Sequence, residues 1–184
     1  MKPIVDIVKE VVETLNTNGT LAKLQAFPIN ATNERNLTAI KYYHGHPIEV
    51  VNTLQQLALA ADTRLTRFPA ICLFQDFAEN LTPQGYNEAR LNIVLCATTD
   101  AKFDAAKRYE NNFKPILYPL LDAFIAALEK HQSVVTYGFE GFTKIDRLFW
   151  GKSGLYGNTA NIFNDFIDAI ELENFLLKTV NNNC

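Results

Sequence analysis

The 184-residue chain lacks three features that often reveal a function: an excess of basic residues, a long apolar segment and a cysteine framework. With 17 Lys and Arg against 20 Asp and Glu, the net charge is -3, so a surface that grips nucleic acid through its phosphates is not expected. No stretch approaches the ~20 apolar residues that cross a bilayer, and an amphipathic pattern, not a signal-peptide core, follows Pro3. Cys72, Cys96 and Cys184 are an odd, widely spaced set, typical of free thiols in a reducing cytoplasm. We therefore expect a soluble protein that stays in the compartment where it is made.

What the chain does contain predicts a folded globule. Apolar residues make up 48% of the sequence and aromatic residues 11%, whereas only 20% is charged, a balance that excludes a disordered chain. A chain of this length supports one domain, which we place over residues 1–184. Within it we expect an insertion at about 20–64 and an arm at about 133–165.

Hydrophobic spacing predicts helices in three places. Apolar residues recur every three or four positions over 3–15, 48–61 and 103–130. Pro115 and Pro119 lie inside the last of these, so we expect a kink or break near 114–119. Residues 20–36, rich in Asn and Thr, are interpreted as a loop with at most a short strand.

Strands are predicted where apolar residues alternate or run continuously. The β-branched and aromatic segment 38–43 favours a strand, and 68–77 is apolar enough to be covered on both faces. Residues 89–98 alternate with period two and should pair with 68–77 as an antiparallel hairpin. A hairpin or arm over 133–150, a loop over 152–161 and a closing strand over 166–179 complete the order. In that last strand Ile170, Leu172 and Leu176 are predicted on one side and Glu171, Glu173 and Phe175 on the other. The sequence therefore predicts a two-layer α+β domain in which a mainly antiparallel sheet packs against a long kinked helix.

No group of side chains forms a convincing catalytic or metal site. His44 and His46 flank Gly45 without a carboxylate or thiol at ligand spacing, which favours turn chemistry over metal binding. His131 is explained by its place at a helix end, where a cationic imidazole complements the helix dipole. Ser133 and Ser153 lack a nucleophile setting, and Gly151-Lys-Ser-Gly154 lacks the first glycine of a phosphate-binding loop because Asp146 stands there. We predict no catalytic residue, no cofactor and no metal.

An acidic cluster near the last strand has a similar interpretation. It comprises Asp165, Asp168, Glu171 and Glu173. Asp168 and Glu171 should point to opposite faces of the strand and so should not act as a paired acid and base. We expect this cluster to be a solvated edge.

The only tryptophan stands out as a candidate binding residue. Trp150 follows Arg147 and Phe149 and precedes a glycine-containing segment with Tyr156, in a region not expected to be deep core. Trp, Tyr and Arg are enriched at the centres of protein interfaces. The alternative interpretation is a tryptophan that covers one end of the sheet.

The succession of motifs resembles the phage tail terminator family, of which the lambda tail terminator is a familiar member. The resemblance is carried by the leading helix 3–15, Phe68-Pro-Ala-Ile-Cys-Leu73, a polar turn, Ala89-Arg-Leu-Asn-Ile-Val-Leu95, a helix with Ile116-Leu-Tyr-Pro119, and Asp168-Ala-Ile-Glu-Leu-Glu173. It covers residues 1–18 and 66–178. The insertion at 20–64 and the long arm at 133–165 depart from the family pattern.

The resemblance implies a non-enzymatic virion protein, assembled in the host bacterial cytoplasm, that forms a ring at the head-proximal end of the tail tube. Such a ring, usually of six copies, stops tube growth and presents a surface to head-completion or connector proteins. Its partners would be copies of itself, the tail tube protein and a neck protein, while DNA passes through the channel without specific binding and no membrane is involved. A mildly acidic lining suits that passage, since a basic one would hold phosphates.

A ring needs two unlike surfaces on each subunit. We predict them around 79–86 and 147–156, with Glu79, Asn80, Tyr86, Arg147, Phe149, Trp150 and Tyr156 as interface residues. Two alternatives remain open: a head-to-tail adaptor or head-closure ring, and a small enzyme or ligand-binding domain with a site around His44 and His46.

Overall fold

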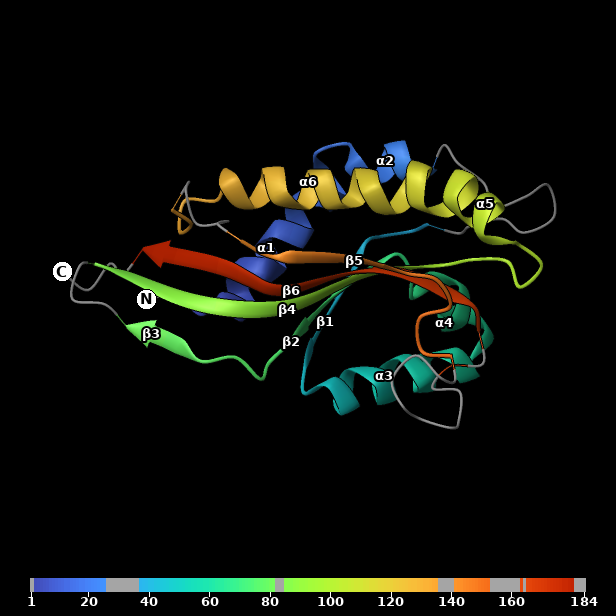
Figure 1. The fold of residues 1–184 in the computed structure, drawn as a ribbon, viewed down its shortest axis with the longest axis horizontal. Coiled ribbons are helices and arrows are strands. Elements are labelled where there is room, and N and C mark those ends of the chain that lie inside the picture. Colours follow the sequence, from blue (N-terminus) through green and yellow to red (C-terminus); the bar gives the residue numbers. More distant parts are fainter. Residues whose placement is uncertain are drawn as a thin grey trace.

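A six-stranded mixed sheet forms the centre of the protein (Figure 1). The computed structural model describes residues 2–25, 37–81, 85–135, 141–152, 163 and 165–180. The strand order is β1-β2-β4-β6-β5, and β3 pairs with β4 beyond the end of β2. Only β1 and β2 are parallel, which confirms the α+β class with a mainly antiparallel sheet. The strands are β1 Lys41–Gly45, β2 Ala70–Phe74, β3 Glu79–Leu81, β4 Tyr86–Thr98, β5 Thr143–Arg147 and β6 Ile167–Val180.

Helices cover both faces of this sheet, whereas the sequence predicted a domain of two layers. On one face lie α1 Ile4–Thr17, α2 Thr20–Gln25, α5 Ala105–Arg108, the π-helix η1 Tyr109–Leu117 and α6 Tyr118–Glu129 (Figure 1). On the other face lie α3 Pro47–Leu59 and α4 Ala61–Thr66, which connect the parallel strands β1 and β2. A parallel connection must cross over a face of the sheet, so this crossover adds a partial third layer.

Two separate cores result from the alternation of side chains along the strands. Ile71 and Leu73 of β2 face the larger core, which also contains the buried faces of α1 and α6. Ala70 and Cys72, the intervening residues, face a smaller core with Leu54 of α3. Because successive residues of a strand point to opposite faces, β2 is buried on both, as its continuous apolar sequence predicts.

The long helical segment contains a π-helix at the place where a kink or break was predicted. From Ala105 to Glu129 the chain runs through α5, η1 and α6 without an intervening loop. Pro115 lies inside η1, and Pro119 lies in the first turn of α6. A proline has no backbone N–H to donate and its ring crowds the preceding turn of an α-helix. Around Pro115 the backbone takes π-helical turns, a form found mostly as an irregularity within α-helices. The prolines therefore change the helix type over nine residues and do not end the helix.

A β-bulge in β6 overturns the predicted sidedness of that strand. Leu91 of β4 is opposite Phe175 and Ile93 is opposite Leu172, so three steps along β6 match two along β4. Asn174 takes a positive φ of 56° at this point, a conformation that asparagine tolerates better than most residues. The extra residue brings Phe175 into the same core as Leu172, although simple alternation predicted opposite sides.

Other predicted boundaries differ in detail. The helices predicted at 3–15 and 48–61 are confirmed as α1 and α3, and the strands at 68–77, 89–98 and 166–179 as β2, β4 and β6. The strand predicted at 38–43 is β1 at Lys41–Gly45, and the region predicted as a loop at 20–36 begins with the helix α2. The segment 133–150 contributes β5 and a single bridge between Val134 and Thr179. Residues 26–36, 136–140, 153–162 and 181–184, with parts of the predicted loops, arm and tail, lie outside the described residues.

Candidate functional site

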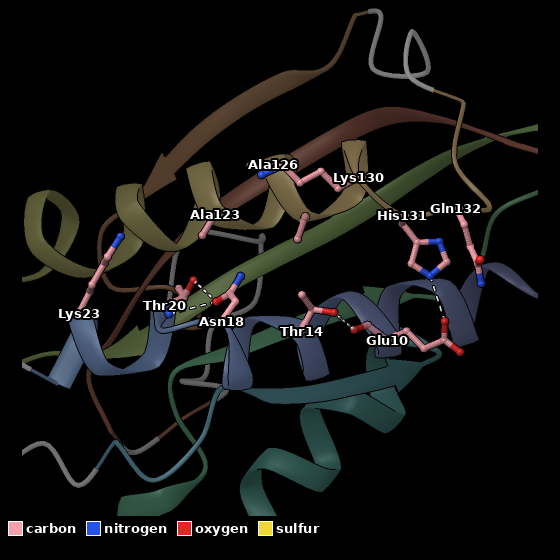
Figure 2. Close-up of a pocket in the computed structure, with 11 residues that line it drawn as sticks. Glu10, Thr14, Asn18, Thr20, Lys23, Ala123, Ala126, Lys130, His131 and Gln132 are labelled. Carbon is pink, nitrogen blue, oxygen red and sulfur yellow. Dashed lines mark hydrogen bonds and ion pairs between the residues drawn. The ribbon is translucent and has the colours of Figure 1, made fainter.

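A groove of about 590 Å³ opens between α1, α2 and α6 (Figure 2). Three alanines of α6, at positions 123, 126 and 127, lie on one side of it, at the spacing that places them on one helix face. Their small side chains leave room that larger residues would fill. The remaining lining residues are all polar: Glu10, Thr14, Asn18, Thr20, Lys23, Lys130, His131 and Gln132.

The one carboxylate that lines the groove is already paired. Glu10 lies 2.5 Å from Nζ of Lys2, and its Oε2 lies 3.0 Å from Nε2 of His131. These hydrogen bonds, from Lys2 first and then from His131, lower the pKa of Glu10. His131 also accepts a hydrogen bond from the backbone N–H of Ser133 at Nδ1, 3.2 Å away, so both ring nitrogens have partners. This pairing fixes the segment after α6 to α1.

The two lysines at the rim have no such partner among the residues that the structure describes. Lys23 of α2 and Lys130 at the end of α6 are both exposed, and neither forms an ion pair with any described residue. Figure 2 shows Lys23 extending from α2 toward α6. The hydroxyl of Thr20 donates to Oδ1 of Asn18 at 2.7 Å, and the hydroxyl of Thr14 donates to the backbone carbonyl of Glu10 at 2.9 Å. The groove therefore offers unpaired positive charge beside small apolar side chains, which favours binding of an acidic group.

A second set of polar side chains, around Asp168, is fully buried. Its burial contradicts the prediction that the acidic cluster is a solvated edge. Asp168 of β6 accepts hydrogen bonds from Arg108 at 2.8 Å, from Asn112 at 3.0 Å and from the backbone N–H of Phe149 at 3.2 Å. The side chains of Asp168 and Arg108 are both completely buried. Arg108 donates further to the carbonyls of Phe103 and Asp100 and lies 3.7 Å from the centroid of the Phe149 ring. With every charge compensated and no access to solvent, this group joins the start of the long helix to β6.

Glu171 also turns inward, on the opposite face of the sheet from Asp168, as alternation predicted. It accepts hydrogen bonds from Nε of Arg147 at 2.6 Å and from the indole Nε1 of Trp150 at 2.9 Å. Asp165 pairs with Arg64 and with the buried Arg67. The acidic cluster was mistaken for an exposed edge because its four arginine partners come from distant parts of the chain, 24 to 101 positions away.

The histidines at 44 and 46 have local structural roles. Nδ1 of His44 lies 2.8 Å from Oε1 of Gln75, and its ring stacks on Tyr42. The side chain of His46 accepts from the backbone N–H of Ile48 and caps α3, while Glu49 accepts from the backbone N–H of His46. Within the described ranges, no three His, Cys, Asp or Glu side chains gather closely enough to hold a metal ion.

The predicted interface residues fall into two groups. Glu79 and Asn80 lie on β3, and Tyr86 begins β4 beside them, so the structure brings these three together at one end of the sheet. Arg147 ends β5, and Phe149 and Trp150 follow it in a turn. Trp150 is only 4% exposed and belongs to the smaller core, so the expectation that this region avoids the core was wrong for that residue. Tyr156 lies outside the described residues.

Sequence reasoning missed the groove because its parts are not adjacent in the chain. Lys23 fell in a segment predicted to be a loop, and Lys130 looked like an ordinary charge at a helix end. One signal was present: Ala123, Ala126 and Ala127 interrupt the otherwise large apolar face of the long helix. Small residues at helical spacing allow a close neighbour or leave a depression, and here they do the second.

Comparison of the chain with protein-family models and with curated proteins finds no match. The resemblance to tail terminators therefore stays a prediction. In the part of the chain that the structure describes, no helix has both the length and the apolar character needed to span a membrane.

Proposed function

We propose that this chain is a structural protein of a phage particle that forms a ring on the tail tube, acting as a tail terminator or a closely related tail-completion protein. The observation that carries the proposal is the difference between the two edges of the sheet. β1 and β3 lie along one edge and β5 lies at the other, and within the described residues none of the three has a second strand partner. Unlike surfaces on opposite sides of a subunit are what a head-to-tail ring requires.

The composition of these edges also supports assembly. Leu81 of β3 is 66% exposed, and an apolar side chain on an open edge strand is a typical site of contact with another chain. β5 presents a different surface, where Lys144 pairs with Asp146, and Asp146 accepts a hydrogen bond from the hydroxyl of Tyr118. Because the two edges present different side chains, they favour a heterologous contact between unlike surfaces over a symmetric dimer.

The buried charges are consistent with a structural role. The carboxylates of Asp168 and Glu171, which are the best-buried acids of the described residues, are each held by an arginine and a second donor. Such pairing lowers their reactivity and fixes the arrangement of β5, β6 and the long helix. A rigid sheet is useful to a subunit that must close a ring.

The test combines native mass spectrometry of the purified protein with electron microscopy of its mixtures with tail tubes. We expect a closed ring, of six copies if the family pattern holds, that caps one end of a tube and halts its growth. A protein that stays monomeric at all concentrations and leaves tube length unchanged would contradict the proposal. Binding to portal protein without binding to tubes would replace it with the adaptor alternative.

A further inference from the structure

The groove between α1, α2 and α6 has a counterpart on the same chain. The segment after β2, residues 76–81, contains Asp76 and Glu79 and ends at the exposed Leu81; we call it the acidic edge. Asp76 is exposed, Glu79 is half-buried, and neither forms an ion pair with a described residue. Two unpaired acids beside an apolar side chain are the chemical complement of two unpaired lysines beside three alanines.

The acidic edge is well placed to enter a neighbouring molecule. Phe77 packs against the larger core, which anchors the segment between the two acids. In Figure 1, β3 lies at the outer side of β4, and the layer formed by α3 and α4 does not reach it. The edge is thus held in position before contact, which reduces the entropy lost on binding.

The groove and the acidic edge belong to different surfaces of the subunit. The groove is lined by helices on one face of the sheet, whereas β3 lies along the sheet edge that also contains β1. None of the residues that line the groove comes from the acidic edge. A contact between them must therefore join two molecules.

We propose that the acidic edge of one subunit docks in the α1–α2–α6 groove of the next copy of this chain. Asp76 and Glu79 pair with Lys130 and Lys23, and Leu81 packs on the alanines of α6. This inference rests on the proposed function, and it adds the groove to the surfaces through which neighbouring subunits of the ring meet. Opposite charges set the register of such a contact and oppose a wrong one.

Charge reversal tests the proposal. The groove variant K23E/K130E and the edge variant D76K/E79K should each weaken subunit association by about tenfold or more, because like charges then face each other. A matched control, K102E/K107E, reverses two exposed lysines that do not line the groove and should form rings as the wild type does. Circular dichroism of every variant checks that the fold is retained.

The decisive measurement is an equal mixture of the two weakened variants. The acidic groove of one variant then faces the lysine-bearing edge of the other, and the unchanged groove faces the unchanged edge. Native mass spectrometry should show rings in which the two variants alternate, although neither variant forms rings alone. A single chain that carries all four substitutions should also recover assembly.

Three outcomes separate this inference from the function on which it rests. If wild-type protein forms rings and both variants still form them alone, the docking contact is wrong and the ring proposal stands. If both variants lose assembly but neither the mixture nor the fourfold variant recovers it, the direct pairing is also wrong. If wild-type protein forms no ring, the proposed function itself fails.

Discussion

Replacing Asp168 by alanine is expected to remove a large part of the protein's stability. The carboxylate accepts three hydrogen bonds, from Arg108, Asn112 and the backbone N–H of Phe149. Its loss would leave the guanidinium of Arg108 completely buried beside two carbonyls and an aromatic ring, without a counter-charge. The two ends of the network, the start of the long helix and β6, would also lose their connection.

The magnitude follows from that burial. Breaking a buried ion pair by removing one partner costs about 3–5 kcal/mol, because the remaining charge stays out of water. The free energy of unfolding of native domains is about 5–15 kcal/mol, so the variant should retain only part of the wild-type stability. At roughly 2–4 °C per kcal/mol for a chain of this size, we expect the melting temperature to fall by about 6–20 °C.

Urea unfolding monitored by tryptophan fluorescence is the appropriate assay. Trp150 is the only tryptophan, it is buried, and its indole N–H donates to Glu171, so its emission should report on global unfolding. Asp122→Ala, which removes an exposed acid of α6, serves as the control and should change stability by less than about 0.5 kcal/mol.

The double variant Arg108→Met/Asp168→Leu gives a second check. Replacing both charges by apolar side chains leaves neither charge uncompensated, so it should destabilise the protein less than Asp168→Ala alone. A loss of unfolding free energy below about 1 kcal/mol for Asp168→Ala would refute the reasoning, because a buried charge without a partner destabilises the fold by more than that. A double variant as unstable as the sum of both single variants would show that the two groups do not interact.

Two further predictions concern the helix ends. The pKa of Glu10 is lowered in the folded state from its ordinary 4.5, so the stability that its carboxylate adds is present above that pH and is lost as the pH falls through the lowered value. The difference in unfolding free energy between wild type and Glu10→Gln should therefore be seen at about pH 6 and vanish at about pH 2; a difference that persists in acid would contradict it. Gly45→Ala should cost roughly 1–2 kcal/mol in thermal unfolding, because Gly45 has a φ of 140° and a Cβ there would lie 3.0 Å from Oε2 of Glu49, which caps α3. Gly19→Ala, at a positive φ with open space, is the matched comparison, and an equal loss would exclude the cap as the cause.

The fold was largely predictable because it depends on local periodicity. The alternation over 89–98 and the continuous apolar run over 68–77 identified the central pair β2 and β4, and three-residue spacing identified α1 and α3. The parallel pairing of β1 with β2 was not predicted. It depends on the crossover through α3 and α4, and hydrophobic spacing says nothing of the direction in which neighbouring strands run.

Long-range pairing limited the prediction of the polar groups. Asp168 and Glu171 looked solvated because a carboxylate without a nearby cation in the sequence is usually exposed. Their partners Arg108 and Arg147 lie 60 and 24 positions away and reach them only in the folded chain. Trp150 was misjudged for the same reason, since charged residues and glycines stand close to it in the sequence, whereas its neighbours in space are Phe163 and the smaller core.

The bulge at Asn174 divides β6 into two parts, in which the core-facing residues fall at even positions before the bulge and at odd positions after it. Leu172 and Phe175 therefore belong to the same core, although they are three positions apart, whereas Glu173 and Leu176 do not belong to it. A deletion of Asn174 would place Phe175 two positions after Leu172, on the same face of the strand, so a regular ladder would form with Phe175 still opposite Leu91. The extra residue therefore shifts the alternation in the sequence without changing which face of the strand is buried.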